Sequence, residues 1–350
     1  MSSRFLKASL RDTQPYVPGE QPPDGEGWIK LNTNESPLPP SPKVIEAIRA
    51  ATGDSLRLYP SSMSAIAREA IGKRLDVDPE LVTLGNGADE IIDMCFRAFA
   101  GAGERVAFCM PTYPVLEPLC RIHDAVAAPH KADESFHWDD RFAYDPAPLK
   151  FVVNPNSPTG TWADPAEVEK VVEVSRGVVV LDEAYVDFAP FDLLALHRRY
   201  RNLLVLRTFS KSYALAGMRI GFAIGSQDVI GALEAVKDSY NLDRLAIVAA
   251  AAAIEDEEHH RKIVDFVVTE REWLAERLRQ QGFQVSPSRA NFVFVKPPRI
   301  SGAAVADALR EQQILVRRYD LEPIAGWLRI TVGTREQHER VLGALKEILA

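Results

Sequence analysis

The chain has 350 residues, of which 46% are hydrophobic and 26% charged, a composition typical of a globular protein with a sizeable core. Its formal net charge is −8 and it has no basic tract, which argues against nucleic acid or an anionic membrane surface as a partner. Cys95, Cys109 and Cys120 show no CxxC spacing, and the first residues do not resemble a signal peptide, so we expect a cytoplasmic protein without disulfides.

The N-terminal part is predicted to be an arm followed by helical elements. Residues 1–28 are rich in proline and glycine, which indicates an extended segment. Ser41 and Pro42 predict the start of a helix, with serine as the N-cap and proline in the first position. Residues 164–167, Asp-Pro-Ala-Glu, have the pattern of a capping box. The buried side of the first helix is predicted to carry three apolar residues: Val44, Ile45 and Ile48.

Between about residues 81 and 225, short apolar runs alternate with helical stretches such as 88–100. Several of these runs are apolar almost throughout, as expected for strands that are buried on both faces of a sheet. This alternation predicts an α/β layer architecture with a mainly parallel central sheet flanked by helices. The predicted strands are 105–110, 150–154, 177–182, 203–207 and 219–225.

After about residue 255 a long helix precedes two strands, 291–295 and 328–333, and a last helix, which predicts a smaller α+β domain. The predicted organisation is therefore an arm (1–28), a large domain (29–255) and a small domain (256–350) that packs with the N-terminal segment. The longest apolar run, 245–254, is too short to cross a bilayer.

Four polar clusters directly follow predicted strands. They are 111–114 (PTYP), 154–160 (NPNSPTG), 182–185 (DEAY) and 208–211 (TFSK). In open α/β sheets, ligands bind outside the carboxyl ends of the strands, so the fold is expected to bring these clusters together. The convergence is the main argument, because each cluster alone is also a plausible turn or loop.

The clusters contain the groups that pyridoxal phosphate requires. Lys211 offers an amine for a Schiff base, and Asp182 ends a buried strand where a protonated pyridine nitrogen would compensate its charge. Tyr185 is predicted to reach the ring hydroxyl. The start of the helix at 88–100 forms an anion site through its free amides. Further donors and a cation for the phosphate are supplied by Thr208, Ser210 and Arg219.

Simpler interpretations exist for each of these residues. A lone lysine is usually a solvated charge, and an aspartate after a strand is usually a turn residue. GNGADE at 85–90 lacks the full GxGxxG spacing, which weakens a dinucleotide-binding interpretation. The seven histidines form no HExxH or paired spacing, so we expect no catalytic metal.

The ordered motifs resemble those of the fold type I aminotransferases, and most closely the histidinol-phosphate aminotransferases. The resemblance covers nearly the whole chain. Its motifs are PYVPG (15–19), LNTNESP (31–37), Tyr59-Pro60, GNGADE (85–90), PTYPV (111–115), NPNSPTG, LDEAYVDF, RTFSKSYALAGMRIGF and LRITVGT. The order and spacing of these motifs agree together, which is more specific than any single motif.

The resemblance implies a role for individual residues. Lys211 is implied as the Schiff-base lysine and the base for the proton shift, Asp182 as the partner of the pyridinium, and Tyr185 as a ligand of the ring oxygen. Tyr113 is implied to stack on the ring. The phosphate is implied to be bound by Ala88, Asp89, Thr208, Ser210 and Arg219, with Tyr59 reaching it from the other subunit of a homodimer. The implied substrate-binding residues are Arg329, Tyr16, Asn34 and Arg317.

One departure from the family pattern concerns the residue before Pro-Thr-Gly. Many relatives have asparagine there, whereas this chain has Ser157, with Asn156 one position earlier. The resemblance leaves open which of the two contacts the cofactor ring, and Asn156 is taken as the candidate.

The implied reaction is the transfer of the amino group of L-histidinol phosphate to 2-oxoglutarate in histidine biosynthesis. Alternatives within the fold are an aromatic-amino-acid aminotransferase and a decarboxylase acting on threonine phosphate. A cofactor-binding regulatory protein would need a DNA-binding module or a basic patch, and a dehydrogenase would need a dinucleotide fingerprint; the sequence contains neither.

Overall fold

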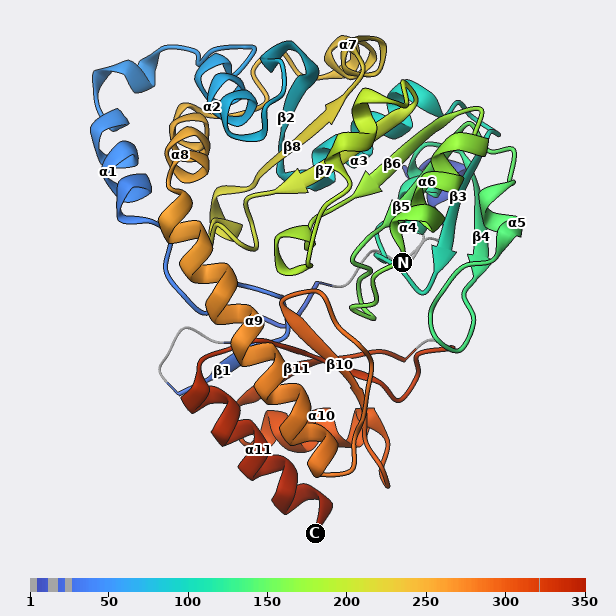
Figure 1. Cartoon of the computed structure of the whole chain (residues 1–350), viewed down its shortest axis with the longest axis vertical. Helices are drawn as coiled ribbons and strands as arrows, with labels where there is room; N and C mark the ends of the chain where they lie inside the picture. Colours follow the sequence, from blue (N-terminus) through green and yellow to red (C-terminus); the bar gives the residue numbers. More distant parts are fainter. Residues whose placement is uncertain (1–4, 12–17, 23–26, 321) are drawn as a thin grey trace.

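The computed structural model describes residues 5–11, 18–22, 27–320 and 322–350, and these form two β-sheets joined by a long helix (Figure 1). The larger sheet has seven strands in the order β2-β8-β7-β6-β5-β3-β4. Its strands are β2 (Val82–Asn86), β3 (Arg105–Met110), β4 (Val126–Lys131), β5 (Leu149–Val153), β6 (Val178–Asp182), β7 (Leu203–Thr208) and β8 (Ile220–Gly225).

The larger sheet is mainly parallel, as predicted, because β8 alone runs against its two neighbours. A parallel connection needs a crossover of a dozen or more residues, usually a helix. Residues 209–219, between β7 and β8, hold only the short 3-10 helix η6 (Ala216–Met218), and the chain therefore returns antiparallel. The same connection carries Lys211.

Helices cover both faces of the larger sheet (Figure 1). One face packs against α3 (Gly87–Phe99), α4 (Leu116–Ile122) and α7 (Gln227–Val236). The opposite face packs against α1 (Pro42–Ala51), α2 (Ala65–Leu75), α5 (Asp140–Ala143), α6 (Pro165–Val174) and α8 (Arg244–Glu255). Alternate residues of β6 and β7 enter the two cores, which explains why these strands are apolar throughout.

The smaller sheet has the order β1-β11-β12-β10-β9. Its strands are β1 (Ile29–Leu31), β9 (Gln284–Val285), β10 (Phe292–Lys296), β11 (Ile314–Arg318) and β12 (Leu328–Thr331), and its helices are α10 (Gly302–Glu311) and α11 (Arg335–Leu349). The long helix α9 (Glu257–Gln280) leads from the larger sheet into this part (Figure 1). Residues 29–31 pair in parallel with β11, whereas the sequence predicts them in the large domain. The domain bounds stay a prediction.

The predicted helix caps are confirmed. The Ser41 side chain accepts a hydrogen bond from the Lys43 amide, and Asp164 forms a capping box with Glu167. The predicted buried face of α1 is wrong at Ile45, which is 37% exposed, because the neighbouring helix α8 covers the side of α1 that carries Val44 instead. None of the described helices is long and apolar enough to cross a membrane.

Candidate active site

The four polar clusters converge on one cavity of about 590 Å³ at the carboxyl ends of the parallel strands. Nine of the predicted cofactor-binding residues line it: Ala88, Asp89, Tyr113, Asp182, Tyr185, Thr208, Ser210, Lys211 and Arg219. The cavity lies between the start of α3 and the loops that follow β3, β5, β6 and β7. The predicted convergence of these segments is therefore present in the structure.

Lys211 lies in the β7–β8 connection and points its amine into the cavity, 5.8 Å from the centroid of the Tyr185 ring. The backbone around it is held from both sides. The Ser210 amide donates to Thr208 Oγ1 at 3.1 Å, and the buried Ser212 hydroxyl donates to Asp187. These bonds hold the lysine backbone against the end of β7 while leaving its side chain in the cavity.

Asp182 ends β6 and is 6% exposed. Its Oδ1 accepts one hydrogen bond, from the Ala184 amide at 2.9 Å. Burial raises the pKa of Asp182 to about 7, and the neighbouring Asp89 and Glu183 carboxylates add to the rise, against the opposing charge of Lys211. A buried carboxylate of this kind is poised to pair with a cationic ligand group in the cavity.

Glu183, the next residue, shows the contrasting case of a paired carboxylate. Its Oε2 accepts two hydrogen bonds from Arg207 on β7, at 2.9 and 2.7 Å, and Arg207 also pairs with Asp192. This buried ion pair ties the ends of β6 and β7 together beside the cavity. No local pattern in the sequence indicates this ion pair, because the β6–β7 register that aligns the two residues is a tertiary feature.

The start of α3 has the geometry that the predicted anion site requires. The Asn86 side chain does not cap the helix, and Ala88 and Asp89 line the cavity. Arg219, in the left-handed conformation with φ 51°, donates to the Asp89 carboxylate at 3.0 Å. Free helix amides beside a guanidinium are suited to a phosphate group.

Gly221 allows β8 to approach the first turn of α3, because a Cβ there would overlap the Ala88 backbone nitrogen. We expect Gly221→Ala to lower the free energy of unfolding by about 2 kcal/mol, since backbone atoms on both sides must move. The matched control is Gly231→Ala in α7, where a Cβ would meet nothing within 4 Å and alanine favours the helix. Urea unfolding of both variants measures the difference, and equal stabilities would contradict the close approach.

The structure places Ser157, rather than Asn156, in the cavity. The Asn156 amide nitrogen donates instead to the Pro111 carbonyl at 2.9 Å and to Thr159 Oγ1 at 2.8 Å. The cavity lining therefore favours Ser157 over Asn156, whose side chain holds two loops together, and the residue that contacts the ring stays a prediction. Tyr113 lines the cavity as predicted, and its hydroxyl donates to Asp89 at 2.9 Å.

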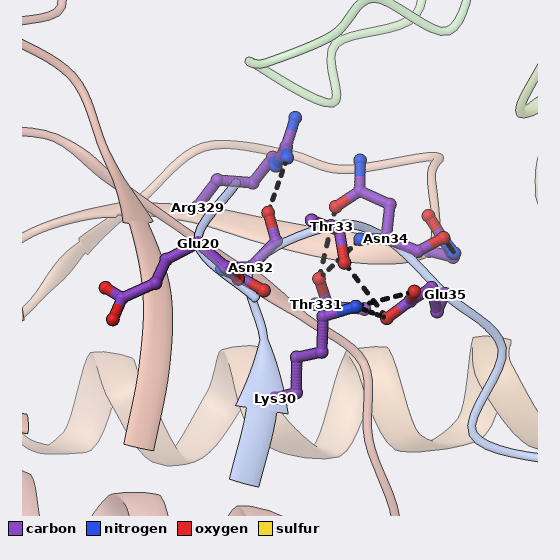
Figure 2. Close-up of polar contacts among 9 residues, drawn as sticks. Glu20, Lys30, Asn32, Thr33, Asn34, Glu35, Arg329 and Thr331 are labelled. Atoms are coloured by element: carbon purple, nitrogen blue, oxygen red, sulfur yellow. Dashed lines mark hydrogen bonds and ion pairs between the residues drawn. The ribbon is translucent and has the colours of Figure 1, made fainter. Parts of the chain in front are cut away.

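Arg329 on β12 lies next to the cavity and is held by residues of other segments. Its Nη2 donates to the Asn32 carbonyl at 3.0 Å (Figure 2), and its Nη1 donates to Ser157 Oγ at 3.3 Å. Among the described residues, its buried Nε has no hydrogen-bond partner, and the Phe292 ring centroid lies 5.3 Å from its guanidinium carbon. A half-buried arginine in this position is suited to an anionic ligand group. Nothing in the sequence indicates the hydrogen bond between Arg329 and the Asn32 carbonyl.

Like Arg329, the predicted substrate residues Asn34 and Arg317 are not among the residues that line the cavity. Arg317 is the β11 partner of Arg329 and lines a separate surface pocket. Asn34 is buried and donates to the Tyr185 hydroxyl at 2.8 Å. Tyr16 lies outside the described residues.

Tyr59 is 77% exposed, stacks on Tyr240 with 4.5 Å between ring centroids, and is not part of this cavity. It lies beside two further exposed apolar residues, Leu56 and Leu58. Its predicted contact with a second subunit stays a prediction. Across the described part of the chain, no group of three or more His, Cys, Asp or Glu residues is arranged to hold a metal ion.

Comparison with known proteins identifies the class of enzyme. Residues 26–345 match the model of the aminotransferase class I and II family, and the chain belongs to this family. It is 43% identical to a histidinol-phosphate aminotransferase of Syntrophotalea carbinolica, over 98% of this chain and 99% of that protein. It is 45% identical to a histidinol-phosphate aminotransferase of Acetobacter pasteurianus, over 99% of this chain and 98% of that protein.

Solved structures agree with this assignment. The histidinol-phosphate aminotransferase of Sinorhizobium meliloti, in complex with pyridoxal-5'-phosphate, matches with a TM-score of 0.86 and 25% identity, over 92% of this chain and 90% of that one. The enzyme of the same name from Clostridium acetobutylicum matches with a TM-score of 0.85 and 23% identity, over 91% and 98%, and supports the fold alone. The predicted fold type I architecture and the aminotransferase class are thereby confirmed.

Proposed function

We propose that the chain catalyses the pyridoxal-phosphate-dependent transfer of an amino group from L-histidinol phosphate to 2-oxoglutarate. The products are imidazole acetol phosphate and L-glutamate, and the reaction belongs to histidine biosynthesis in the cytoplasm. The observation that carries the proposal is full-length identity of 40–45% to proteins of this activity, together with a cavity that holds Lys211, Asp182 and Tyr185.

The residues of the cavity fit pyridoxal phosphate. Asp182 is buried without a cationic hydrogen-bond partner, which suits a protonated pyridine nitrogen. At the start of α3, the Arg219 guanidinium occupies the position that a Cβ of residue 87 would take. Only glycine at position 87 therefore leaves room for Arg219 beside the helix start. We assign the phosphate to the amides of Ala88 and Asp89 with Arg219 and the hydroxyl groups of Thr208 and Ser210, and the ring face to Tyr113.

When bound, pyridoxal phosphate supplies an aldehyde that takes up the amino group and a ring that accepts electrons. The Lys211 amine would hold the aldehyde end of the cofactor, and as the base in the cavity it would move the proton at the substrate carbon. Asp182 holds the proton on the pyridine nitrogen, and Tyr185 and Ser157 bind the ring oxygen. Tyr113 orients the ring by covering its face.

Arg329 is assigned to the anionic end of both substrates, the phosphate of the donor and the carboxylate of the acceptor. We expect Arg329→Gln to lower kcat/KM about 10²-fold in both half-reactions, because one charged hydrogen-bonding group serves both anions. Each half-reaction is measured in single-turnover experiments. Arg318→Gln, which removes an exposed arginine from the neighbouring strand, is the matched control. A loss confined to one half-reaction would contradict the shared site.

Substrate profiling tests the proposal as a whole. Purified protein loaded with pyridoxal phosphate is offered L-histidinol phosphate, phenylalanine, tyrosine and threonine phosphate, with 2-oxoglutarate as acceptor and with detection of released carbon dioxide. The highest kcat/KM is expected for histidinol phosphate, without carbon dioxide. A preference for aromatic amino acids would retain the enzyme class and replace the substrate, and carbon dioxide from threonine phosphate would replace the reaction.

A homodimer is part of the proposal. The exposed side chains of Leu56, Leu58 and Tyr59 form an apolar surface beside a pocket of about 870 Å³, which a second copy would cover. Tyr59 is then assigned to the cofactor phosphate of the partner subunit. Sedimentation at assay concentration tests this assignment, and an active, fully loaded monomer would refute it.

A further inference from the structure

Asn34 is bound to the protein through all of its polar groups. It is 2% exposed and has a left-handed backbone with φ 56°, a conformation that asparagine tolerates better than most residues. Its amide N–H donates to Thr331 Oγ1 at 3.0 Å, and its carbonyl accepts from Asn291 Nδ2 at 2.9 Å. Its side chain lies between Thr331 and Tyr185 (Figure 2 shows the Thr331 side). These contacts leave little of the hydrogen-bonding capacity of Asn34 for a substrate.

The hydrogen bonds to Thr331 determine which way the Asn34 side-chain amide faces. A threonine hydroxyl has a single hydrogen. In the structure, Thr331 Oγ1 accepts from the Asn34 backbone N–H at 3.0 Å and donates its one hydrogen to Asn34 Oδ1 at 3.2 Å. The oxygen of the amide therefore faces Thr331 and the NH₂ group faces Tyr185.

The orientation of the amide determines the direction of the next hydrogen bond. An NH₂ group only donates, so Tyr185 Oη is the acceptor of the 2.8 Å bond from Asn34 Nδ2. The single hydrogen of the Tyr185 hydroxyl must then point to another acceptor. Tyr185 lines the cavity together with Asp182, Ser157 and Lys211, whose amine lies over the Tyr185 ring.

We propose that Asn34 is a positioning residue that directs the hydroxyl hydrogen of Tyr185 toward the ring oxygen of the cofactor. The inference rests on the proposed function, because it assumes pyridoxal phosphate in the cavity. It replaces the predicted contact of Asn34 with substrate. The hydrogen bond from Tyr185 stabilises the negatively charged form of the ring oxygen. The oxygen then binds less tightly the proton that it shares with the Lys211 nitrogen. Tyr185 thereby lowers the pH at which this proton is lost.

Asn34→Asp reverses the bond while changing few atoms. A carboxylate still accepts from Thr331, but its second oxygen also accepts, so Tyr185 must donate to residue 34 rather than to the cofactor. Asn34→Ala removes more hydrogen bonds but leaves the Tyr185 hydrogen free for the cofactor. A purely structural role predicts the larger effect for alanine, and the proposed role predicts the larger effect for aspartate.

The experiment is a pH titration of the visible absorption of the protein loaded with pyridoxal phosphate, without substrate. We expect Asn34→Asp and Tyr185→Phe each to raise the midpoint of the spectral transition by about 1 to 2 pH units, and Asn34→Ala to raise it less. In a Tyr185→Phe background, Asn34→Asp is expected to add no further shift. The comparison in the Tyr185→Phe protein thus distinguishes the effect of the reversed hydrogen bond from the effect of the carboxylate charge on the midpoint.

Thr331 provides a second pair of variants if Asn34→Asp does not fold. Thr331→Val removes the donor that holds Asn34 Oδ1, lets the amide turn, and is expected to raise the midpoint; Thr331→Ser retains the hydroxyl and the wild-type midpoint. Unchanged midpoints in Asn34→Asp and Thr331→Val, or an equal shift in the Tyr185→Phe background, would overturn the inference alone. A wild-type protein that takes up no cofactor would overturn the proposed function, and the inference with it.

Discussion

Lys211→Ala is expected to leave a folded protein that binds pyridoxal phosphate without a covalent bond and turns over at least about 10³-fold more slowly. The amine is the group in the cavity placed to bind the aldehyde and to move the substrate proton, and proton transfer alone contributes about 10²- to 10⁴-fold. The measurement combines steady-state kinetics with borohydride reduction of the loaded protein, followed by mass spectrometry of the peptide that contains residue 211.

The folded structure should tolerate this substitution, because the bonds that hold the loop come from its neighbours. Ser210 and Ser212 anchor the backbone on either side, and the Lys211 side chain projects into the cavity. Lys211→Arg is the control that retains the charge but cannot form the same adduct. Lys346→Ala, at the far end of α11, should match the wild type. Cofactor trapped on any other lysine would refute the assignment.

Asp182→Asn is expected to have opposite effects on stability and on activity. Without cofactor at pH 8, we expect the variant to be more stable than the wild type by about 4 kcal/mol, since an uncharged amide replaces a buried carboxylate whose pKa is raised from 3.8 to about 7. With substrates, we expect turnover to fall at least about 10²-fold, because the pyridine nitrogen loses the partner that holds its proton. Thermal unfolding of the cofactor-free protein and steady-state kinetics measure the two effects.

The stability difference at Asp182 should depend on pH in a defined direction. The folded-state pKa is raised from 3.8 to about 7, so between these values the folded protein binds a proton that the unfolded chain has lost. The stability of the wild type relative to the variant therefore falls as pH rises from about 4 to 7, and stays lower above 7. At pH 4 the two proteins should be equally stable. A difference independent of pH would contradict the raised pKa.

Glu183→Gln is the matched comparison, because Glu183 is the neighbouring buried carboxylate but is paired. Its removal leaves the buried Arg207 guanidinium without its main partner, and we expect a loss of about 3 kcal/mol at pH 8. Two adjacent carboxylates on one strand end should thus respond with opposite signs. Asp182, the carboxylate without an ion-pair partner, is the one that lines the cavity. This arrangement is expected of a group that binds a cationic part of a ligand.

Much of the fold could be predicted because its signals are local. The apolar runs of β3, β5, β6, β7 and β8 are read from adjacent residues, and the Ser41 and Asp164 caps from three or four positions. Strands of two or three residues, such as β1 and β9, contain too few residues for a periodic pattern. Their pairing depends on a neighbour elsewhere in the chain, as β1 depends on β11.

The candidate site also has features that local sequence determines and features that only the folded chain determines. The residue types at the strand ends, with Lys211, Asp182, Tyr185 and Arg219 in order, are a property of the sequence, and the parallel sheet necessarily gathers them at one edge. Which side chains enter the cavity is a property of the folded chain. Asn156 turns away to hold Pro111, whereas Ser157 faces Arg329, and nothing in the spacing of adjacent residues distinguishes them.

Local patterning thus accounts for the elements and for the chemistry available to this protein, because helix and strand periods and caps involve residues within a few positions of each other. Packing of distant segments accounts for how that chemistry is tuned. Asp182 acquires its raised pKa through burial, and Asn34 acquires a role at Tyr185, 151 positions away, through its contact with Thr331. Burial and the direction of a hydrogen bond depend on every group around an atom, and those groups come together only when the chain folds.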